Sequence, residues 1–144
     1  MRSGVTIFPG SNCDRDIIVA LKNITGKAPI KMWHKDTEFP NLDLIVIPGG
    51  FSFGDYLRCG ALAARSPVIK SIKNHISRGG AVLGICNGFQ ILIEAGILPG
   101  SLIRNKKLLF TCRDTTLEIQ DTIISPFLSN LKKEHNLNIP VAHN

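Results

Sequence analysis

The sequence predicts an α/β protein built on a doubly wound, mostly parallel sheet with helices on both faces. Between residues 5 and 95, short apolar runs alternate with segments of helical periodicity, which is typical of such a sheet. One run, Leu42–Ile47, is almost continuously apolar, as expected of a strand covered on both faces. With 144 residues, of which 44% are hydrophobic, the chain is long enough to bury one core.

The elements of the first half follow in order. A strand is predicted over 5–8 and is ended by Pro9-Gly10. A helix is predicted over 14–25, stopped by Gly26, and a weaker strand over 30–33. One face of that helix is expected to carry its apolar residues, which are Ile17, Ile18, Leu21 and Ile24.

The next elements repeat the alternation. Ser66-Pro67 is a favourable start for a helix over 67–78, whose apolar stripe is Val68, Ile69, Ile72 and Ile76. A strand over 81–85 and a helix over 87–95 come after Gly79-Gly80.

The last third has a different pattern. Residues 108–113 and 115–120 are predicted to form two strands joined tightly at Arg113-Asp114, and Ser125-Pro126 to begin a short helix. Residues 138–142 form a last extended piece, and the sequence stops in mid-pattern. We therefore expect residues 1–144 to be a single domain whose C-terminal part is missing.

Composition excludes several classes of protein. No apolar run reaches the roughly 18–20 residues of a membrane span, and the N-terminus lacks the features of a signal peptide. Four cysteines without Cys-x-x-Cys spacing favour reduced thiols in the cytoplasm over disulfides or a zinc site. The net charge of +6 is spread thinly, so we expect neither a nucleic-acid partner nor a membrane partner, and no metal.

The sharpest motif is Gly84-Ile-Cys-Asn-Gly88, which lies between a predicted strand and a predicted helix. Glycine two residues on either side of a nucleophile is typical of a nucleophile elbow, a tight turn that presents its central side chain at the edge of the sheet. Cys86 would lie there at a helix N-terminus, whose dipole favours a thiolate. A buried structural cysteine is the alternative interpretation.

A second motif, Pro48-Gly-Gly-Phe-Ser-Phe-Gly-Asp55, follows the apolar third strand. It matches neither a phosphate-binding P-loop nor a dinucleotide-binding motif. Its consecutive glycines leave backbone N–H groups free to face a ligand, so they could supply half of an oxyanion hole and the N–H of Asn87 the other half. A flexible surface turn is the alternative.

Together these two motifs resemble class I glutamine amidotransferases, whose domain has a flavodoxin-like fold. Phe8-Pro-Gly-Ser-Asn-Cys-Asp-Arg-Asp16, Leu98-Pro-Gly100, Arg104-Asn105 and Phe110-Thr-Cys-Arg113 narrow the resemblance. They are similar to segments of the glutaminase subunits of phosphoribosylformylglycinamidine synthases, which act in purine biosynthesis.

The resemblance implies that Cys86 attacks the side-chain amide of glutamine and forms a thioester, releasing ammonia. It implies an oxyanion hole of Gly50, Phe51 and Asn87, and a substrate site of Gly49, Phe51 and Gln90. The expected partners are a large synthetase subunit, which uses the ammonia, and a small bridging subunit. ATP and magnesium would bind to the synthetase, and this chain would hold no cofactor.

The family also uses a histidine in a His-x-Glu pair beyond the stretch matched by Ala142-His143. None of the four histidines here, His34, His75, His135 and His143, is followed two residues later by glutamate. His75 and His135 are expected to face solvent, and His34 to lie near the sheet edge. We therefore expect this chain to be truncated and to have little glutaminase activity alone.

Three other functions stay open. A cysteine hydrolase or chaperone resembling DJ-1 and PfpI would share the elbow, but such proteins usually have histidine after the nucleophile, where Asn87 stands here. A flavodoxin-like FMN protein would need a phosphate loop richer than Pro9-Gly-Ser-Asn12. The chain could also serve only to dock on the synthetase.

Overall fold

The computed structural model of the protein describes residues 1–119, 125–131 and 135–144. The chain forms two compact units, Met1–Leu102 and Ile103–Asn144. The first unit contains the alternating strands and helices, and the second contains a two-stranded sheet.

The first unit is built on a four-stranded parallel sheet with the order β2-β1-β3-β4. Because the strand order reverses direction after β2, the sheet is doubly wound, as the sequence predicts. Its strands are β1 (Ser3–Ile7), β2 (Ile30–Trp33), β3 (Leu44–Ile47) and β4 (Ala81–Gly84).

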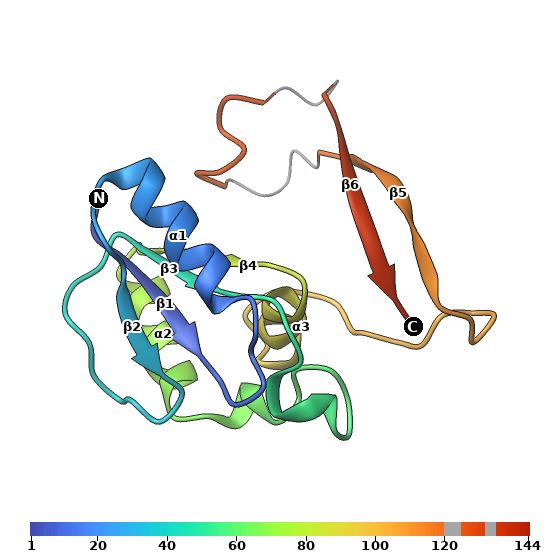
Figure 1. The fold of residues 1–144 in the computed structure, drawn as a ribbon, viewed down its shortest axis with the longest axis horizontal. Coiled ribbons are helices and arrows are strands. Elements are labelled where there is room, and N and C mark those ends of the chain that lie inside the picture. Colours follow the sequence, from blue (N-terminus) through green and yellow to red (C-terminus); the bar gives the residue numbers. More distant parts are fainter. Residues whose placement is uncertain (120–124, 132–134) are drawn as a thin grey trace. The chain divides into compact units, whose positions relative to one another are not determined.

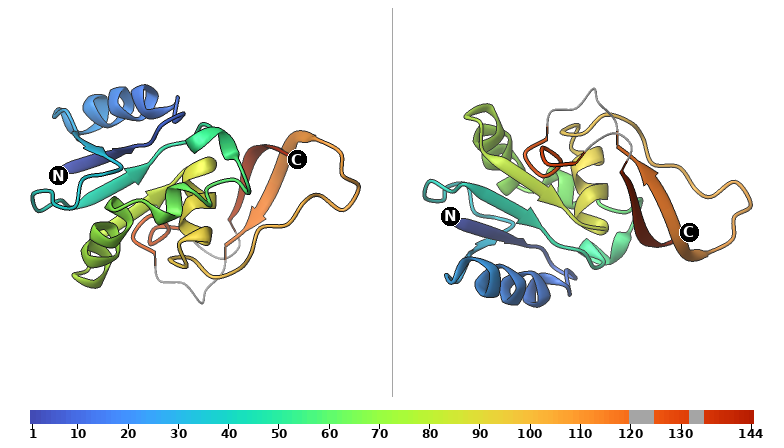
Figure 2. Two further views of the ribbon diagram at one scale, coloured as in Figure 1. Left: turned by 90° about the horizontal axis from the view of Figure 1, so that it is seen from below. Right: turned by 90° about the horizontal axis from the view of Figure 1, so that it is seen from above.

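Helices cover both faces of this sheet (Figures 1 and 2). On one face lies α1 (Asp14–Thr25), and on the other lie α2 (Val68–Ser77) and α3 (Asn87–Glu94). Two short 3₁₀ turns, η1 (Ser52–Asp55) and η2 (Ala63–Arg65), connect β3 to α2.

The central strand β3 divides the core into two layers. Leu44 and Val46 pack with Leu21 of α1, whereas Ile45 and Ile47 belong to the layer beneath α2 and α3. All four residues of β3 are buried, because successive side chains of a strand point to opposite faces and both faces are covered. The predicted two-sided burial of this strand is confirmed.

The predicted apolar face of α1 is wrong at Ile24, which is 81% exposed. Ile17, Ile18 and Leu21 pack on the sheet as expected. Twelve helical residues extend about 18 Å, but strands of four or five residues extend only about 13–17 Å. The last turn of the helix therefore has little sheet beneath it.

The expectation that His75 faces solvent is also wrong. The side chain is 3% exposed, and its Nε2 lies 3.1 Å from the carbonyl oxygen of Ala81. His75 follows Ile72 by three residues and so shares its inward face. The ring occupies the space that a side chain at Gly80 would fill, because a Cβ there would lie 2.1 Å from His75 Cε1.

In the second unit, β5 (Thr111–Glu118) pairs antiparallel with β6 (Asn136–His143). The predicted tight hairpin at Arg113-Asp114 is wrong, since Arg113 pairs with Val141 in the middle of the ladder. Two-residue hairpin turns need positive φ, which Arg-Asp does not favour. The first of the two predicted strands, 108–113, also begins too early. The observed strand begins at Thr111, and Leu108 has a φ of 54°. The last residue of the second predicted strand, Gln120, lies outside the described residues.

The helix predicted at Ser125-Pro126 is a set of turns instead. Leu128 donates its N–H to the Ser125 carbonyl at 3.1 Å, and Leu131 donates to Leu128 at 2.9 Å. Such a short segment gains too few hydrogen bonds to offset the cost of nucleating a helix. The last extended piece, predicted over 138–142, lies within β6 and is confirmed.

Candidate active site

Three loops meet at one edge of the first unit's sheet, beyond the carboxyl ends of β1, β3 and β4. These strands are neighbours and parallel, so the loops that follow them leave from the same edge (Figure 1). They contain residues 8–13, 48–55 and 85–88, the segments that the sequence singled out. Ligands of open parallel sheets bind at this edge.

Cys86 lies at the turn between β4 and α3 with a φ of 52° and a ψ of −111°. A positive φ is uncommon for a side chain other than glycine, and such strain clusters at functional sites. The cysteine is exposed. It is therefore held out at the sheet edge, in the position of an elbow nucleophile, rather than buried in the core.

The two glycines of the elbow motif are required by close packing. A Cβ at Gly88 would lie 2.0 Å from the carbonyl oxygen of Ile47, so α3 could not approach β3. A Cβ at Gly84 would lie 2.8 Å from the backbone of Gly88 and 2.6 Å from Leu92 Cδ1. The spacing Gly-x-Cys-x-Gly thus follows from how tightly the strand, the turn and the helix pack.

Gly49 brings the second motif next to the cysteine. A Cβ at Gly49 would lie 3.3 Å from Cys86 Cβ, which is closer than most contacts between real side chains. Gly50 has a φ of 123°, and a Cβ there would lie 2.6 Å from Asn12 of the first loop. The absence of side chains at these two positions lets all three loops converge.

The backbone N–H groups at this edge differ in their partners. The N–H of Phe51 donates to the Gly10 carbonyl at 3.1 Å, whereas no backbone hydrogen bond within residues 1–119 uses the N–H of Gly50 or of Asn87. Asn87 is the first residue of α3, where helix N–H groups lack partners within the helix. The available donors are thus those of Gly50 and Asn87, while Phe51 presents a side chain that is 62% exposed.

The side chain of Asn87 has a structural role that the sequence did not indicate. It is 2% exposed, and its Oδ1 accepts the N–H of Ser52 at 3.1 Å. Its Nδ2 donates to Asp55 Oδ1 and to Gln90 Oε1, both at 3.0 Å. The side chain of Asn87 therefore connects η1 to the start of α3 through hydrogen bonds. The side chain of Gln90 is half-buried.

An ion pair makes a second connection between these elements. Arg58 donates to Glu94 through Nε at 3.0 Å and through Nη2 at 2.6 Å. The hydrogen bonds from Arg58 lower the pKa of the Glu94 carboxyl. Asn87 and Arg58 thus connect η1 and the residues that follow it to α3.

Two further cysteines lie close to the site. The Cβ position of Gly49 is 3.7 Å from Cys13 Sγ, and Cys13 is half-buried at the start of α1. Burial, followed by Asp16, raises the pKa of the Cys13 thiol. Burial, followed by Asp55, raises the pKa of the Cys59 thiol. The sequence offered one signal for Cys13, its place in the loop after the first strand.

The histidines of the first unit have other partners. His34 is 7% exposed, its Nδ1 lies 3.3 Å from Ser66 Oγ, and its ring contacts Trp33 and Phe53. His75 contacts the Ala81 carbonyl as described above. Between Met1 and Leu102, neither ring forms a hydrogen bond with Cys86. The nucleophile position therefore has no histidine beside it within this unit.

Comparison with known proteins places these features in a family. A family model for the CobB/CobQ-like glutamine amidotransferase domain matches residues 1–144. The chain belongs to this amidotransferase family. The match covers both the elbow motif and the glycine-rich segment, so the resemblance expected from the sequence is confirmed at the level of the family.

Two curated relatives of this amidotransferase chain carry the same name. The phosphoribosylformylglycinamidine synthase subunit PurQ of Zymomonas mobilis is 57% identical over 144 residues, which are 99% of this chain and 65% of that protein. The subunit of the same name from Rhizobium meliloti is 54% identical over 143 residues, 99% of this chain and 64% of that protein. The amidotransferase chain thus spans about 65% of the length of these relatives.

Among solved structures, a chain of PurLQS from Thermotoga maritima is similar to this amidotransferase chain. The TM-score is 0.84 at 42% identity, over 99% of this chain and 66% of that one. The parallel sheet with helices on both faces is therefore the fold of a solved relative, as well as the fold predicted from the sequence.

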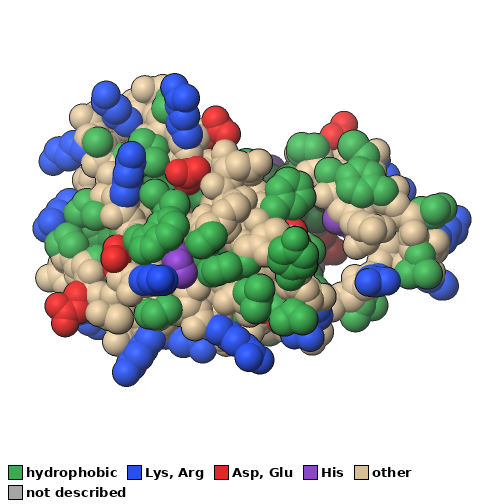
Figure 3. All heavy atoms as spheres, turned by 60° about the horizontal axis from the view of Figure 1, so that its bottom comes forward, with side chains coloured by type: hydrophobic (Ala, Val, Ile, Leu, Met, Phe, Trp, Pro, Cys, Tyr) green, Lys and Arg blue, Asp and Glu red, His purple; other side chains and the backbone are tan. Residues whose placement is uncertain are grey.

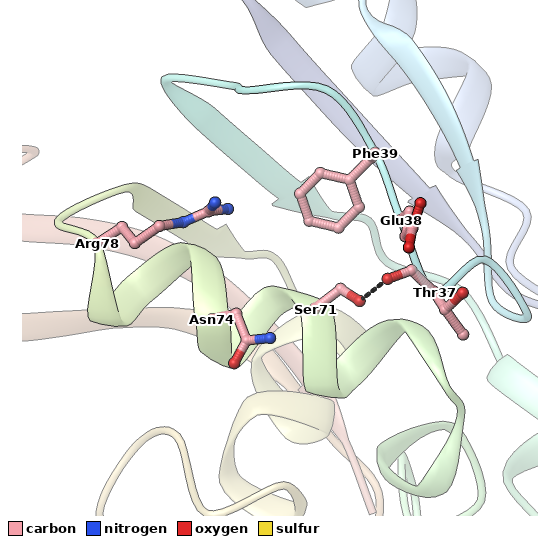
Figure 4. Close-up of a pocket in the computed structure, with 6 residues that line it drawn as sticks. All are labelled: Thr37, Glu38, Phe39, Ser71, Asn74 and Arg78. Carbon is pink, nitrogen blue, oxygen red and sulfur yellow. Dashed lines mark hydrogen bonds between the residues drawn. The ribbon is translucent and has the colours of Figure 1, made fainter.

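A pocket of about 270 Å³ lies elsewhere on this amidotransferase domain (Figure 4). Ser71 Oγ donates to the Thr37 carbonyl at its edge. Its lining residues include none of the predicted site residues, and they are Thr37, Glu38, Phe39, Ser71, Asn74 and Arg78. Within residues 1–119, 125–131 and 135–144, no three His, Cys, Asp or Glu side chains are grouped as metal ligands would be.

The surface of the amidotransferase domain carries apolar side chains, with Lys and Arg scattered around them (Figure 3). Around the glycine-rich segment the exposed ones are Phe51, Tyr56 and Leu57, at 62%, 74% and 85% of their area. Phe89 of α3 is 44% exposed. No helix in the described part of the chain is long and apolar enough to cross a membrane.

Proposed function

We propose that this domain is the glutamine-hydrolysing part of a phosphoribosylformylglycinamidine synthase. The observation that carries the proposal is the exposed Cys86, held at positive φ beside Gly49 in a member of the glutamine amidotransferase family. The thiolate of Cys86 attacks the side-chain amide carbon of glutamine, and the carbonyl oxygen takes up negative charge. Loss of ammonia leaves a thioester, which water hydrolyses to glutamate.

The backbone around the cysteine supports this chemistry. An oxyanion hole needs N–H donors that are fixed before the reaction and are not already bonded. The N–H groups of Gly50 and Asn87 meet that condition, whereas the N–H of Phe51 is engaged by Gly10. We therefore assign the oxyanion hole to Gly50 and Asn87, and give Phe51 a role through its side chain.

The substrate site would be formed by residues around these donors. Gly49 leaves room next to the sulfur, and the exposed ring of Phe51 offers an apolar wall for the methylene groups of glutamine. Gln90 uses its Oε1 to accept from Asn87, so its amide nitrogen is left to donate to the substrate. Glutamine would thus bind between the glycine-rich segment and α3.

Proton transfer limits what these 144 residues do by themselves. The thiol must lose a proton and the leaving ammonia must gain one, which is the work of a general base and acid. No His-x-Glu pair occurs in the sequence, and His34 and His75 are bonded elsewhere. We therefore propose that the 144-residue chain reacts with glutamine only slowly.

The partners follow from the names of the relatives. Their shared name is that of a synthase subunit, and the solved relative is described as PurLQS. We propose that this domain docks on an ATP-dependent synthetase subunit, together with a small bridging subunit, and passes ammonia to it in the cytoplasm. ATP and magnesium would bind to the synthetase. The exposed Phe51, Tyr56 and Leu57 provide an apolar surface of the kind that protein partners cover.

Covalent labelling tests the glutaminase proposal. The chain is incubated with a diazoketone analogue of glutamine, with and without glutamine, and the labelled peptide is identified by mass spectrometry. We expect label on Cys86 that glutamine suppresses, no label in Cys86→Ser, and unchanged label in the control Cys112→Ser. Label that is distributed over several cysteines, or that glutamine does not suppress, would contradict the proposal.

A measurement of glutamate release tests the proposal that the 144-residue chain reacts with glutamine only slowly. We expect the 144-residue chain to release glutamate slowly, and a full-length relative assayed in parallel to release it many times faster. Rapid release by the short chain that is lost in Cys86→Ser would show that a base is already present. Binding is tested by co-purification with the synthetase subunit, which Tyr56→Ser and Leu57→Ser should weaken.

A further inference from the structure

Cys13 and Cys86 lie on either side of Gly49. One point in space, the Cβ position of Gly49, is 3.7 Å from Cys13 Sγ and 3.3 Å from Cys86 Cβ. The two distances leave at most about 7 Å between Cys13 Sγ and Cys86 Cβ. Two cysteines from loops 73 residues apart in sequence are thus near neighbours in space.

The topology explains this approach. Cys13 follows β1 and Cys86 follows β4, and the strand between them is β3. Two strand spacings amount to about 9–10 Å, too far for direct contact of backbones. Because position 49, two residues beyond the end of β3, is glycine, no side chain at that position stands between the two cysteines.

The two thiols differ in their exposure to solvent. Cys86 is exposed at the start of α3. Cys13 is half-buried, and its Sγ donates to Asn12 Oδ1 at 3.5 Å. Burial and the nearby Asp16 raise the pKa of the Cys13 thiol. An oxidant from solution would therefore meet Cys86 first.

We infer that Cys13 is a resolving thiol that captures oxidised Cys86 in an intramolecular disulfide. A peroxide transfers one oxygen to the Cys86 thiolate, giving a sulfenic acid and an alkoxide or hydroxide, which takes up a proton. The Cys13 sulfur then attacks the Cys86 sulfur, and the S–O bond breaks. The hydroxyl group leaves as water with the proton of Cys13, so that the peroxide is the only oxidant required.

The consequence for activity rests on the proposed function, whereas the disulfide itself does not. A bond between Cys13 and Cys86 removes the sulfur that would attack glutamine. It also protects that sulfur from irreversible oxidation to sulfinic acid, and a dithiol restores it. The pair would thus stop ammonia production reversibly under oxidising conditions.

Cys59 is the competing partner, since it also lies near enough to interact with Cys86 electrostatically. Burial and the nearby Asp55 carboxylate, however, raise the pKa of its thiol. The pKa of the Cys13 thiol is also raised, by burial and Asp16, so the choice between the two partners rests on their positions. Cys13 interacts instead with a neutral amide oxygen, and it has the open position of Gly49 between itself and Cys86.

Peptide mapping tests the inference, because trypsin places each cysteine on a different peptide. Cys13 is in 3–15, Cys59 in 59–65, Cys86 in 79–104 and Cys112 in 108–113. The 144-residue chain is treated with a slight excess of hydrogen peroxide, free thiols are alkylated, and the digest is analysed by mass spectrometry. We expect peptides 3–15 and 79–104 joined, lighter by two hydrogen atoms, and separated again by dithiothreitol.

Variants make the outcome decisive. In Cys13→Ser the link should be absent, and Cys86 should proceed to sulfinic acid several times faster than in the wild type. Cys59→Ser and the control Cys112→Ser should retain the link. A link from Cys86 to Cys59, a link between two chains, or a wild type in which Cys86 is over-oxidised while Cys13 stays free would overturn the inference.

The glutamine analogue separates the two proposals. If reduced Cys86 takes the label but the link does not form, only the redox inference fails. If the link forms but glutamine does not suppress labelling, the proposed function fails and the disulfide stands. If both hold, peroxide treatment should abolish labelling in the wild type, and dithiothreitol should restore it.

Discussion

Asn87 Nδ2 donates to Asp55 Oδ1 at 3.0 Å, which joins the residue after the candidate nucleophile to the end of the glycine-rich segment. The same side chain accepts the N–H of Ser52 at 3.1 Å. Asn87 is 2% exposed, so water does not compete for these hydrogen bonds. The buried amide of Asn87 therefore helps to hold the glycine-rich segment beside Cys86.

Replacing that amide should destabilise the first unit. Asn87→Ala leaves the buried N–H of Ser52 without its partner, and an unsatisfied buried group costs about 1–3 kcal/mol. We expect a loss of about 2 kcal/mol in the free energy of unfolding, measured by urea denaturation at neutral pH. Asn74→Ala, at an exposed position of α2, is the control and should change stability by no more than about 0.5 kcal/mol. Equal effects of the two substitutions would contradict this role of Asn87.

A second prediction concerns the packing of α3 against β3. In Gly88→Ala the added methyl group would lie 2.0 Å from the Ile47 carbonyl oxygen, which is backbone and has little freedom to move. We expect a loss of about 3 kcal/mol or more, seen as a lower midpoint of thermal unfolding. Gly96→Ala is the matched control. Its φ is 66° but nothing lies within 4 Å, so it should cost only about 1–2 kcal/mol. A smaller effect at Gly88 than at Gly96 would refute the packing argument.

Much of the first unit could be predicted because its signals are local. The apolar run ending at Ile47 and the stops at Gly26 and Gly79 depend on residues close in sequence. The predicted hairpin at Arg113-Asp114 is wrong because Arg113 pairs with Val141, 28 residues away, and nothing near Arg113 signals that partner. The polarity of His75 predicts an exposed side chain, but its place on the inward face of the helix buries it.

At the candidate site, the local signal in the sequence is the set of glycines that close packing requires. Gly84, Gly88 and Gly49 are each explained by one close approach of backbone or side chain. Contacts made by side chains across loops could not be predicted in the same way. The hydrogen bonds of Asn87 and the approach of Cys13 to Cys86 depend on where three loops converge, which strand order determines and local sequence does not.

The ion pair between Arg58 and Glu94 predicts a pH dependence. Arg58 lowers the pKa of Glu94 in the folded state, so the pair contributes stability above the pKa of an unfolded glutamate, about 4.3. That contribution is lost as the pH falls through the lower folded value. The effect is small, since Arg58 is largely in water and its charge is screened.

Comparing Glu94→Gln with the wild type in urea tests this sign. We expect the variant to be slightly less stable at neutral pH, and the difference to shrink toward zero as the pH is lowered below the folded pKa. Glu38→Gln, at an exposed position, is the control and should show little difference at any pH. A difference that grows in acid would contradict the assigned direction.

The thiol of Cys13 should ionise at a higher pH than a free cysteine, whose pKa is about 8.5. Burial disfavours the thiolate and raises the pKa, and the negative charge of Asp16 raises it further. In a variant that retains only Cys13, with serine at 59, 86 and 112, the rate of alkylation by iodoacetamide should rise with a midpoint above that of a small thiol. Asp16→Asn removes one of the two causes of the raised pKa and should lower the midpoint of the alkylation rate. Asp36→Asn, at a position beyond β2, is the control and should leave that midpoint unchanged. A midpoint at or below that of the small thiol would mean that Cys13 is neither shielded from water nor influenced by Asp16, and it would then react with peroxide as readily as Cys86.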